Sequence, residues 1–193
     1  MALNHTGTVE LETNRLKLRR YTPDDAEAMF YGWASDPQVA EYLTWEPHPN
    51  PDATRALIET WCAEYDKPNY YNWVIEYEGK PIGNISVVDI RERNERAVIG
   101  YCLSRKHWGK GIMPEAFTAV IDYLFGTVGF HAIEAEHDEF NPKSGRVMEK
   151  CGMTKDGARR QAWHHRNGEW HDLVIYSILR DEWRQSWLKR CKA

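Results

Sequence analysis

Hydrophobic and polar positions in the first half of the chain predict a strand, two helices and then a series of strands. Alternation over Leu11–Tyr21 predicts the first strand, and Thr22-Pro23 is a typical start for a helix that runs through Phe30. Apolar residues at helical spacing predict a second helix over Asp52–Tyr65, after the proline-rich loop Glu46–Asp52. Apolar runs bounded by turn residues then predict three strands: Tyr71–Tyr77, Pro81–Asp89 and Ala97–Ser104.

The second half alternates between helices and strands. The segment Arg105–Gly111 opens a helix with one apolar face, and a strand follows over His131–Asp138. Asn141-Pro142 starts a short helix that ends at Cys151-Gly152. Asn167-Gly168 predicts a hairpin between strands Arg160–Arg166 and Glu169–Leu179, and Trp183, Trp187 and Leu188 of the C-terminal stretch share one side that packs on the same domain or on a second copy.

This order of elements predicts an α/β fold with a mixed, mostly antiparallel sheet. The 193 residues contain no repeat, low-complexity tract or Gly/Ser linker, so we expect a single domain over residues 1–193.

Charge and hydropathy exclude several classes of function. The 25 Lys and Arg residues against 29 Asp and Glu residues give a net charge of -4, which argues against nucleic-acid binding. No apolar run is long enough to span a membrane, and the first residues do not resemble a secretory signal. We therefore expect a cytoplasmic protein with no membrane or nucleic-acid partner. The four cysteines (Cys62, Cys102, Cys151 and Cys191) are widely spaced and are interpreted as reduced thiols.

The segment Arg105–Gly111, with the sequence RKHWGKG, is the strongest local signal for chemistry. Gly109 and Gly111 lack a Cβ, so the backbone there can approach an anion closely. Unpaired N–H groups and the helix dipole favour phosphate at such a helix start, and Lys106 and Lys110 add positive charge. The segment matches neither GxxxxGK[ST] nor GxGxxG. The alternative is a basic surface loop with a helix cap.

A second polar segment, Asn141-Pro142-Lys143-Ser144, follows the next strand. Asn141 is suited to be a helix N-cap, and Ser144 to be its capping partner. Both also lie after a strand beside the one that feeds the glycine segment. Adjacent strands that open into two helix starts form a natural slot for an elongated, phosphate-bearing ligand.

Several segments in this order resemble the GNAT acetyltransferase superfamily, and more narrowly its ribosomal-protein-alanine (Rim-type) branch. The similar segments cover most of the chain: Thr13–Arg19, Pro81-Ile82-Gly83, Ile99-Gly100-Tyr101, Lys106–Gly111, Glu115-Ala116, Asn141, Ser144, Lys150–Met153 and Trp170-His171-Asp172. The resemblance implies a GNAT-like sheet with helices on both faces. It also implies transfer of an acetyl group from acetyl-CoA to a primary amine, such as the N-terminal amine of a ribosomal protein.

The resemblance further implies which residues contact coenzyme A. Backbone groups near the end of one strand would bind the pantetheine arm, N–H groups of the glycine segment would bind the pyrophosphate, and two polar residues would line the far wall. The expected cofactor residues are Cys102, Leu103, Ser104, Lys106, His107, Trp108, Gly109, Lys110, Gly111, Ile112, Asn141 and Ser144. His107 is also suited simply to cap the loop.

The catalytic residues are less constrained. Many relatives carry a tyrosine where this chain has Met148, and a glutamate where it has Val98. Ser144 is therefore the candidate proton donor to the leaving thiolate. Glu134 and Glu136 share one face of a strand, and Glu136 is the candidate catalytic carboxylate; the alternative is a solvated surface.

Acceptor-binding candidates come from two loops. Asp172 is suited to hold an ammonium, with a paired turn acid as the alternative, and Trp45 lies in an aromatic loop. The histidines His164, His165 and His171 lack the partners of a usual zinc site, so we expect no metal. The acceptor is a protein N-terminus or a small amine such as a polyamine or amino sugar. Loss of the usual acid and base also fits a non-catalytic acyl-CoA-binding or sensing domain, monomeric or homodimeric.

Overall fold

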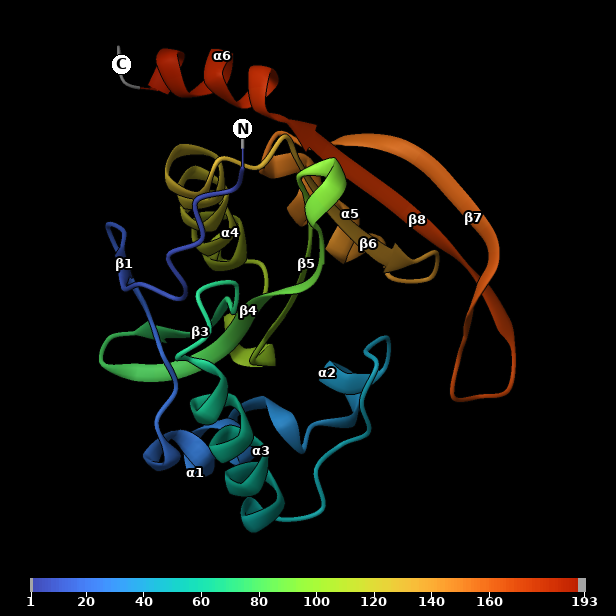
Figure 1. Ribbon diagram of the computed structural model, residues 1–193. Helices are drawn as coiled ribbons and strands as arrows, with labels where there is room; N and C mark the ends of the chain where they lie inside the picture. The colour runs from blue at the N-terminus through green and yellow to red at the C-terminus, as the bar shows by residue number, and fades with distance from the viewer. Residues whose placement is uncertain (1, 191–193) are drawn as a thin grey trace. The chain divides into compact units, whose positions relative to one another are not determined.

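The computed structural model describes residues 2–190 (Figure 1). These residues group into two compact units. One unit contains residues 5–87 and 101–119, and the other contains residues 2–4, 88–100 and 120–190. Within residues 2–190, eight strands form a mixed, mostly antiparallel sheet, so the predicted fold class is confirmed. That the chain is a single domain remains a prediction.

The strands of the first unit begin with a correction. The stretch predicted as one strand forms two antiparallel strands, β1 (Leu11–Glu12) and β2 (Leu16–Arg19). The Thr13 N–H donates to the Leu16 carbonyl at 2.9 Å, and the Thr13 hydroxyl accepts a hydrogen bond from the N–H of Leu16 at 2.9 Å, so one backbone bond and one side-chain bond close the turn between the two strands. Strand β2 pairs with β3 (Asn72–Tyr77), which forms a hairpin with β4 (Lys80–Arg91), as predicted.

The helices of the first unit surround an aromatic core. The first predicted helix is confirmed as three short segments: a 3₁₀ turn over Pro23–Asp25, helix α1 (Ala26–Met29) and a π-helical turn over Phe30–Ala34. Helix α2 (Pro37–Ala40), capped by Asp36, was not predicted, whereas α3 (Pro51–Glu64) lies close to the predicted range. Trp33 and Ile58 are fully buried in this core.

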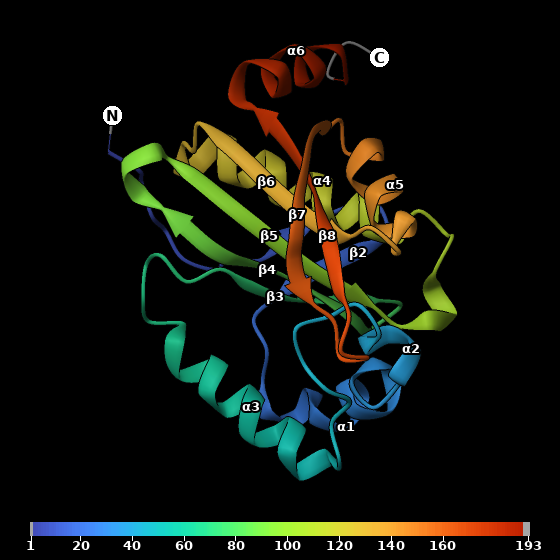
Figure 2. The same ribbon diagram turned by 90° about the vertical axis from the view of Figure 1, so that its right-hand side faces the viewer.

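The second unit carries the parallel pair. Strand β5 (Arg96–Leu103) begins in this unit, and its residues 96–99 pair in parallel with β6 (Ala132–Asp138). Strand β8 (Trp170–Leu179) pairs antiparallel with both β6 and β7 (Thr154–His164), and Figure 2 shows the three strands side by side. Ala97, Val98 and Ile99 are all buried, as the apolar run of this strand predicted.

The β7–β8 hairpin differs from its prediction in two ways. Strand β7 begins at Thr154, whereas the sequence predicted a start at Arg160. The register shifts between Lys155 and Gly157 and between Arg159 and Trp163, and these irregularities interrupt the alternation of apolar and polar residues on which the prediction depended. The connecting loop spans residues 165–169 instead of two residues, with the His165 N–H donating to the Glu169 carbonyl at 2.9 Å. Asn167-Gly168 nevertheless lies in the turn, with Gly168 at φ 89°.

The helices of the second half are α4 (Ile112–Tyr123), α5 (Pro142–Lys150) and α6 (Arg180–Arg190). In α6, Trp183 is buried beside Phe125, and its indole N–H donates to Asp122 at 2.6 Å. The predicted packing is confirmed for Trp183, but Trp187 and Leu188 are 41% and 52% exposed.

Two observations concern the described residues alone. No helix in this part of the chain has the length and apolar character needed to cross a membrane. Cys62 and Cys102 are free thiols, and Cys191 lies outside the described residues.

Replacement of Gly145 tests how tightly α5 packs on the sheet. A Cβ at Gly145 would lie 2.7 Å from Nε2 of buried His137, whose ring is held by a contact between its Nδ1 and the Asp138 carbonyl. We expect Gly145→Ala to lower the free energy of unfolding by about 1 kcal/mol or more, measured by urea denaturation. Gly32→Ala is the control, because no atom lies within 4 Å of its added Cβ. An equally stable Gly145→Ala variant would contradict this packing.

Candidate functional site

The glycine segment lies between the end of β5 and the start of α4. One 3₁₀ turn covers Arg105–His107, and α4 begins at Ile112, so the helix starts after the glycines rather than within them. Gly109 and Gly111 have φ values of 75° and 73°, a region that residues with a Cβ rarely adopt. No atom lies within 4 Å of a Cβ built on Gly109. The backbone is therefore open at the point where we expected an anion to approach.

Hydrogen bonds divide the N–H groups of this segment into two sets. Ser104 donates to the Ile82 carbonyl at 2.8 Å, and Trp108 donates to the Arg105 carbonyl at 3.2 Å. These two N–H groups are thus used within the protein. In the described part of the chain, no turn or loop hydrogen bond uses the N–H groups of residues 109–112. Unpaired N–H groups at a helix start attract an anion, and here the following helix has three turns.

The charges around the segment suit the same ligand. Lys106 and Lys110 contribute two cations, and Arg105 forms an ion pair with Asp36 at 3.0 Å. Burial, and then the charges of Lys110 and Lys106, lower the pKa of His107. The imidazole is therefore neutral at physiological pH, and the positive charge of the loop comes from the lysines.

A set of polar contacts braces the start of α4. The Glu115 carboxylate accepts hydrogen bonds from the Thr13 hydroxyl at 2.6 Å and from Nε of Arg15 at 2.7 Å. Arg15 also donates to the carbonyl of Lys110 at 3.2 Å, inside the glycine segment. These contacts lower the pKa of Glu115 although its burial alone would raise it, so the Glu115 carboxylate stays charged. Through Thr13 and Arg15, the turn between β1 and β2 thus holds both the glycine segment and the first turn of α4 in place.

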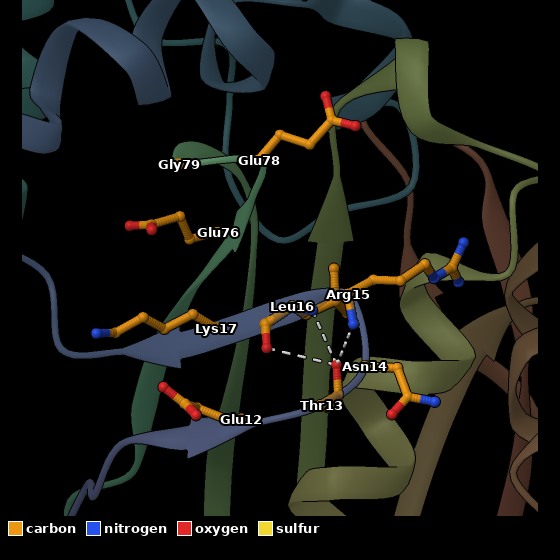
Figure 3. Close-up of a pocket in the computed structure, with 9 residues that line it drawn as sticks. All are labelled: Glu12, Thr13, Asn14, Arg15, Leu16, Lys17, Glu76, Glu78 and Gly79. Carbon is orange, nitrogen blue, oxygen red and sulfur yellow. Dashed lines mark hydrogen bonds between the residues drawn. The ribbon is translucent and has the colours of Figure 1, made fainter.

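The same turn also lines an open depression, together with residues of the β3–β4 hairpin (Figure 3). Its lining is mostly charged and comprises Glu12, Thr13, Asn14, Arg15, Leu16, Lys17, Glu76, Glu78 and Gly79. Lys17 pairs with Glu10 at 3.0 Å. None of the predicted site residues lines it.

The end of β5 carries Cys102 and Leu103, two further predicted cofactor-binding residues of the first unit. The Leu103 carbonyl accepts a hydrogen bond from the indole N–H of Trp108 at 2.7 Å. Burial raises the pKa of the Cys102 thiol to about 12. Cys102 is therefore protonated at physiological pH and unsuited to act as a nucleophile.

The predicted cap at the start of α5 is confirmed. The Asn141 side chain accepts a hydrogen bond from the Ser144 N–H at 3.4 Å, and both residues are half-buried. Met148, one turn later, is fully buried and serves as a packing residue. Asn141 and Ser144 belong to the second unit, whereas residues 102–112 belong to the first.

The carboxylates of β6 and β8 already have protein partners. Glu134 is buried and pairs with Arg91 and Arg96, and Glu136 pairs with Arg159. Asp172 accepts a hydrogen bond from the N–H of Gln161 at 2.8 Å and so holds the irregular part of β7. The solvated face considered for Glu134 and Glu136 describes exposed Glu136 but is wrong for buried Glu134, and Asp172 is a paired turn acid.

Trp45 is half-buried in the first unit. Its ring meets that of His48 at 5.5 Å, and it packs against the core around Trp33. Burial lowers the pKa of His48, so this loop carries a neutral imidazole at physiological pH.

The hairpin histidines occupy different environments. His171 is 4% exposed, and its Nδ1 lies 2.6 Å from a carboxylate oxygen of Asp138. The ring of His165 stacks on it at 4.7 Å, while His164 instead contacts Trp170. Within the described residues, no cluster of three His, Cys, Asp or Glu side chains is arranged to hold a metal ion.

Sequence reasoning missed two pairs in these sites. Arg15 and Glu115 are 100 residues apart, and Asp138 and His171 are 33 apart. The alternation Glu134-x-Glu136-x-Asp138 was a signal for the second pair, because it puts Asp138 on the same face of β6 as the two glutamates.

Comparison with known proteins identifies the family. A model described as an acetyltransferase (GNAT) domain matches residues 15–154. The chain is 33% identical to the uncharacterized N-acetyltransferase YoaA of Bacillus subtilis over 172 residues, which are 88% of this chain and 96% of that protein. It is 28% identical to the [ribosomal protein uS5]-alanine N-acetyltransferase of Escherichia coli over 185 residues, covering 91% and 93% of the two chains.

A solved structure agrees. The ribosomal-protein-S5-alanine acetyltransferase of Vibrio fischeri superposes with a TM-score of 0.79 at 25% identity, covering 91% of this chain and 98% of the other. With the family match spanning most of the sequence, the chain belongs to the GNAT family of N-acetyltransferases.

Proposed function

We propose that this protein transfers an acetyl group from acetyl-CoA to the N-terminal amine of a protein. The observation that carries the cofactor part is the open glycine segment, where the N–H groups of residues 109–112 have no turn or loop acceptor in the described chain. A pyrophosphate supplies acceptors of the required charge at that position. Lys106 and Lys110 strengthen its binding electrostatically.

The proposed cofactor contacts follow from this anchor. Gly109, Lys110, Gly111 and Ile112 donate N–H groups to the pyrophosphate, and the Leu103 backbone binds the pantetheine arm. Ser104 and Trp108 contribute through groups other than their N–H, because those are already used. Cys102, His107, Asn141 and Ser144 remain proposed contacts on the strength of the family resemblance.

The transfer needs little from the protein beyond positioning and proton movement. The acceptor ammonium loses one proton, and its nitrogen then bonds to the thioester carbon as the C–S bond breaks. The departing sulfur gains the second proton of the amine nitrogen, directly or through a donor. The acyl group passes directly to the amine, since the thiol of Cys102 is protonated. Ser144 is the proposed donor.

The acceptor is proposed from the relatives. The Escherichia coli relative is named for acetylation of an alanine of ribosomal protein uS5, and it matches nearly all of this chain. Asp172, Glu136 and Trp45 remain proposed acceptor-side residues. Glu136 must first leave Arg159, and Asp172 has one oxygen free of its bond to Gln161. Small amines and a non-catalytic acyl-CoA sensor are the alternatives.

We also propose a cytoplasmic location, where acetyl-CoA and ribosomal proteins are both present. The protein would act as a monomer or homodimer, and its net charge of -4 favours no nucleic-acid partner.

An acetylation assay tests the proposed function. We expect release of free CoA thiol when the protein, acetyl-CoA and a peptide with a free N-terminal alanine are combined, and no release when that N-terminus is blocked. Spermidine and glucosamine are the small-amine controls. CoA binding without thiol release on any amine would favour the sensor, and preference for a small amine would contradict the protein acceptor.

Gly111→Val tests the anion site. Valine disfavours the φ of 73° at this position, and its branched Cβ obstructs backbone approach to a phosphate. We expect CoA affinity to fall at least tenfold in titration calorimetry. Gly79→Val is the matched control, since Gly79 has φ 72° in the β3–β4 turn and no atom within 4 Å of its added Cβ. Equal affinity of the two variants for CoA would contradict the assignment.

Ser144→Ala tests the proton donor. The N-cap bond uses the backbone N–H of Ser144, so the replacement leaves it in place. We expect kcat to fall about tenfold or more while the dissociation constant of CoA changes little. Unchanged steady-state kinetics would remove Ser144 from the proton-donor role.

A further inference from the structure

A buried acid–histidine pair lies at the end of β6. The Asp138 side chain is fully enclosed at 3% exposure, and one of its oxygens contacts Nδ1 of His171 at 2.6 Å. Its other oxygen accepts the N–H of Phe140 at 2.9 Å. The carboxylate is thereby held in one orientation, so Nδ1 of His171 carries the proton and Nε2 is left as a proton acceptor.

The Nε2 atom of His171 has no hydrogen-bond partner among the described residues, although it is buried. A carboxylate oxygen of Glu169 lies 3.7 Å from it, within ion-pair range of a protonated imidazole but beyond hydrogen-bond distance. A buried imidazole nitrogen without a partner is destabilising unless a ligand supplies one. An N–H of an ammonium group has the chemistry to do so.

The surroundings of this ring also suit a cation. Asp138 lies on one side, Glu169 approaches from the hairpin loop, and His165 stacks on the ring at 4.7 Å. The edge of the ring meets Phe140, which is itself 58% exposed. In antiparallel register, His171 lies opposite Trp163 of β7. Asp138 and Glu169 therefore place two carboxyl groups beside His171, and the exposed ring of Phe140 contacts it.

The pair is joined to a proposed cofactor residue by a short turn. The N–H of Asn141 donates to the carbonyl of Asp138 at 2.8 Å, so the carboxylate and the cap of α5 are fixed in one segment. Both partners of the pair, and Asn141, belong to the same unit.

We infer that His171 is the general base of the acetyl transfer and that Asp138 is the residue that positions it. This inference rests on the proposed function. Nε2 accepts one proton from the acceptor ammonium, which becomes a neutral amine, and His171 becomes an imidazolium stabilised by Asp138 and Glu169. The amine nitrogen then forms the amide bond as the C–S bond breaks, and its second proton goes to the sulfur. The imidazolium returns its proton to water after the products leave.

The pH dependence of the rate gives the signature. The hydrogen bond that His171 donates to Asp138 raises the pKa of His171 above its ordinary value of 6.5, and Glu169 acts in the same direction. The base is therefore active above that raised pKa and lost below it. The N-terminal amine of the peptide acceptor titrates in the same way whichever enzyme variant is used. The ratio of the wild-type rate to the variant rate at each pH therefore reports the titration of the group on the enzyme.

The experiment compares the wild-type protein with His171→Gln across pH, using acetyl-CoA and a peptide with a free N-terminal alanine. We expect kcat of His171→Gln to be about 100-fold lower at pH 8. This difference should shrink as the pH falls below the pKa of His171. Affinity for CoA, measured by calorimetry, should not change. His164→Gln is the matched control, because His164 contacts Trp170 and not the pair.

Asp138→Asn separates positioning from folding. The variant keeps the size and the acceptor oxygen of the side chain but removes its charge. We expect the midpoint of the pH profile to move to lower pH, a change that a purely structural role would not produce. A melting temperature measured for each variant identifies loss of fold.

Three outcomes would overturn the inference. An unchanged pH profile in folded His171→Gln would show that another group takes the proton. If Glu136→Gln, and not His171→Gln, removed the pH dependence of the rate, the base would be Glu136. If the wild-type protein acetylated no amine, both the proposed function and the assignment of His171 as its base would be contradicted. If the wild-type protein turned over and His171→Gln had the same rate and pH profile, only the assignment of His171 would be contradicted.

Discussion

The start of α4 presents backbone N–H groups that the protein does not cap, and the proposed chemistry depends on this feature. Most helix starts are satisfied by a side chain, as Asn50 and Asn141 do for α3 and α5. At α4, two glycines with positive φ precede the helix, and residues 109–112 lack turn or loop acceptors in the described chain. An anionic ligand is the natural acceptor there, and a diphosphate meets several of these groups at once.

Neighbouring contacts keep this helix start in place. Glycine-rich backbone is conformationally free, so a binding loop of this kind loses entropy on ligand binding unless something restrains it beforehand. Arg15 supplies the restraint by joining Glu115 of α4 to the carbonyl of Lys110. The contact is half-exposed, and its value lies in geometry more than in stability.

Patterns of residues close in the sequence predicted most helices and strands, but they did not predict contacts between residues far apart in the sequence. The strand–glycine–helix segment and the Asn141 cap depend on residues close in sequence, and the structure contains both. Thr13 breaks the first strand through one backbone bond and one side-chain bond, and two register shifts within β7 conceal its start. The Asp138–His171 pair joins two strands whose pairing no local pattern specifies, so the sequence offered His171 only as one of three hairpin histidines.

Pyrophosphate binding at the start of α4 is measured most directly by comparing ligands rather than variants. Calorimetric titration of the wild-type protein with CoA and with pantetheine isolates the contribution of the phosphate-bearing half. If the amides of residues 109–112 bind the pyrophosphate, CoA binds at least 100-fold more tightly than pantetheine, and its affinity falls as salt increases. Equal affinity for the two ligands, independent of salt, would contradict the account.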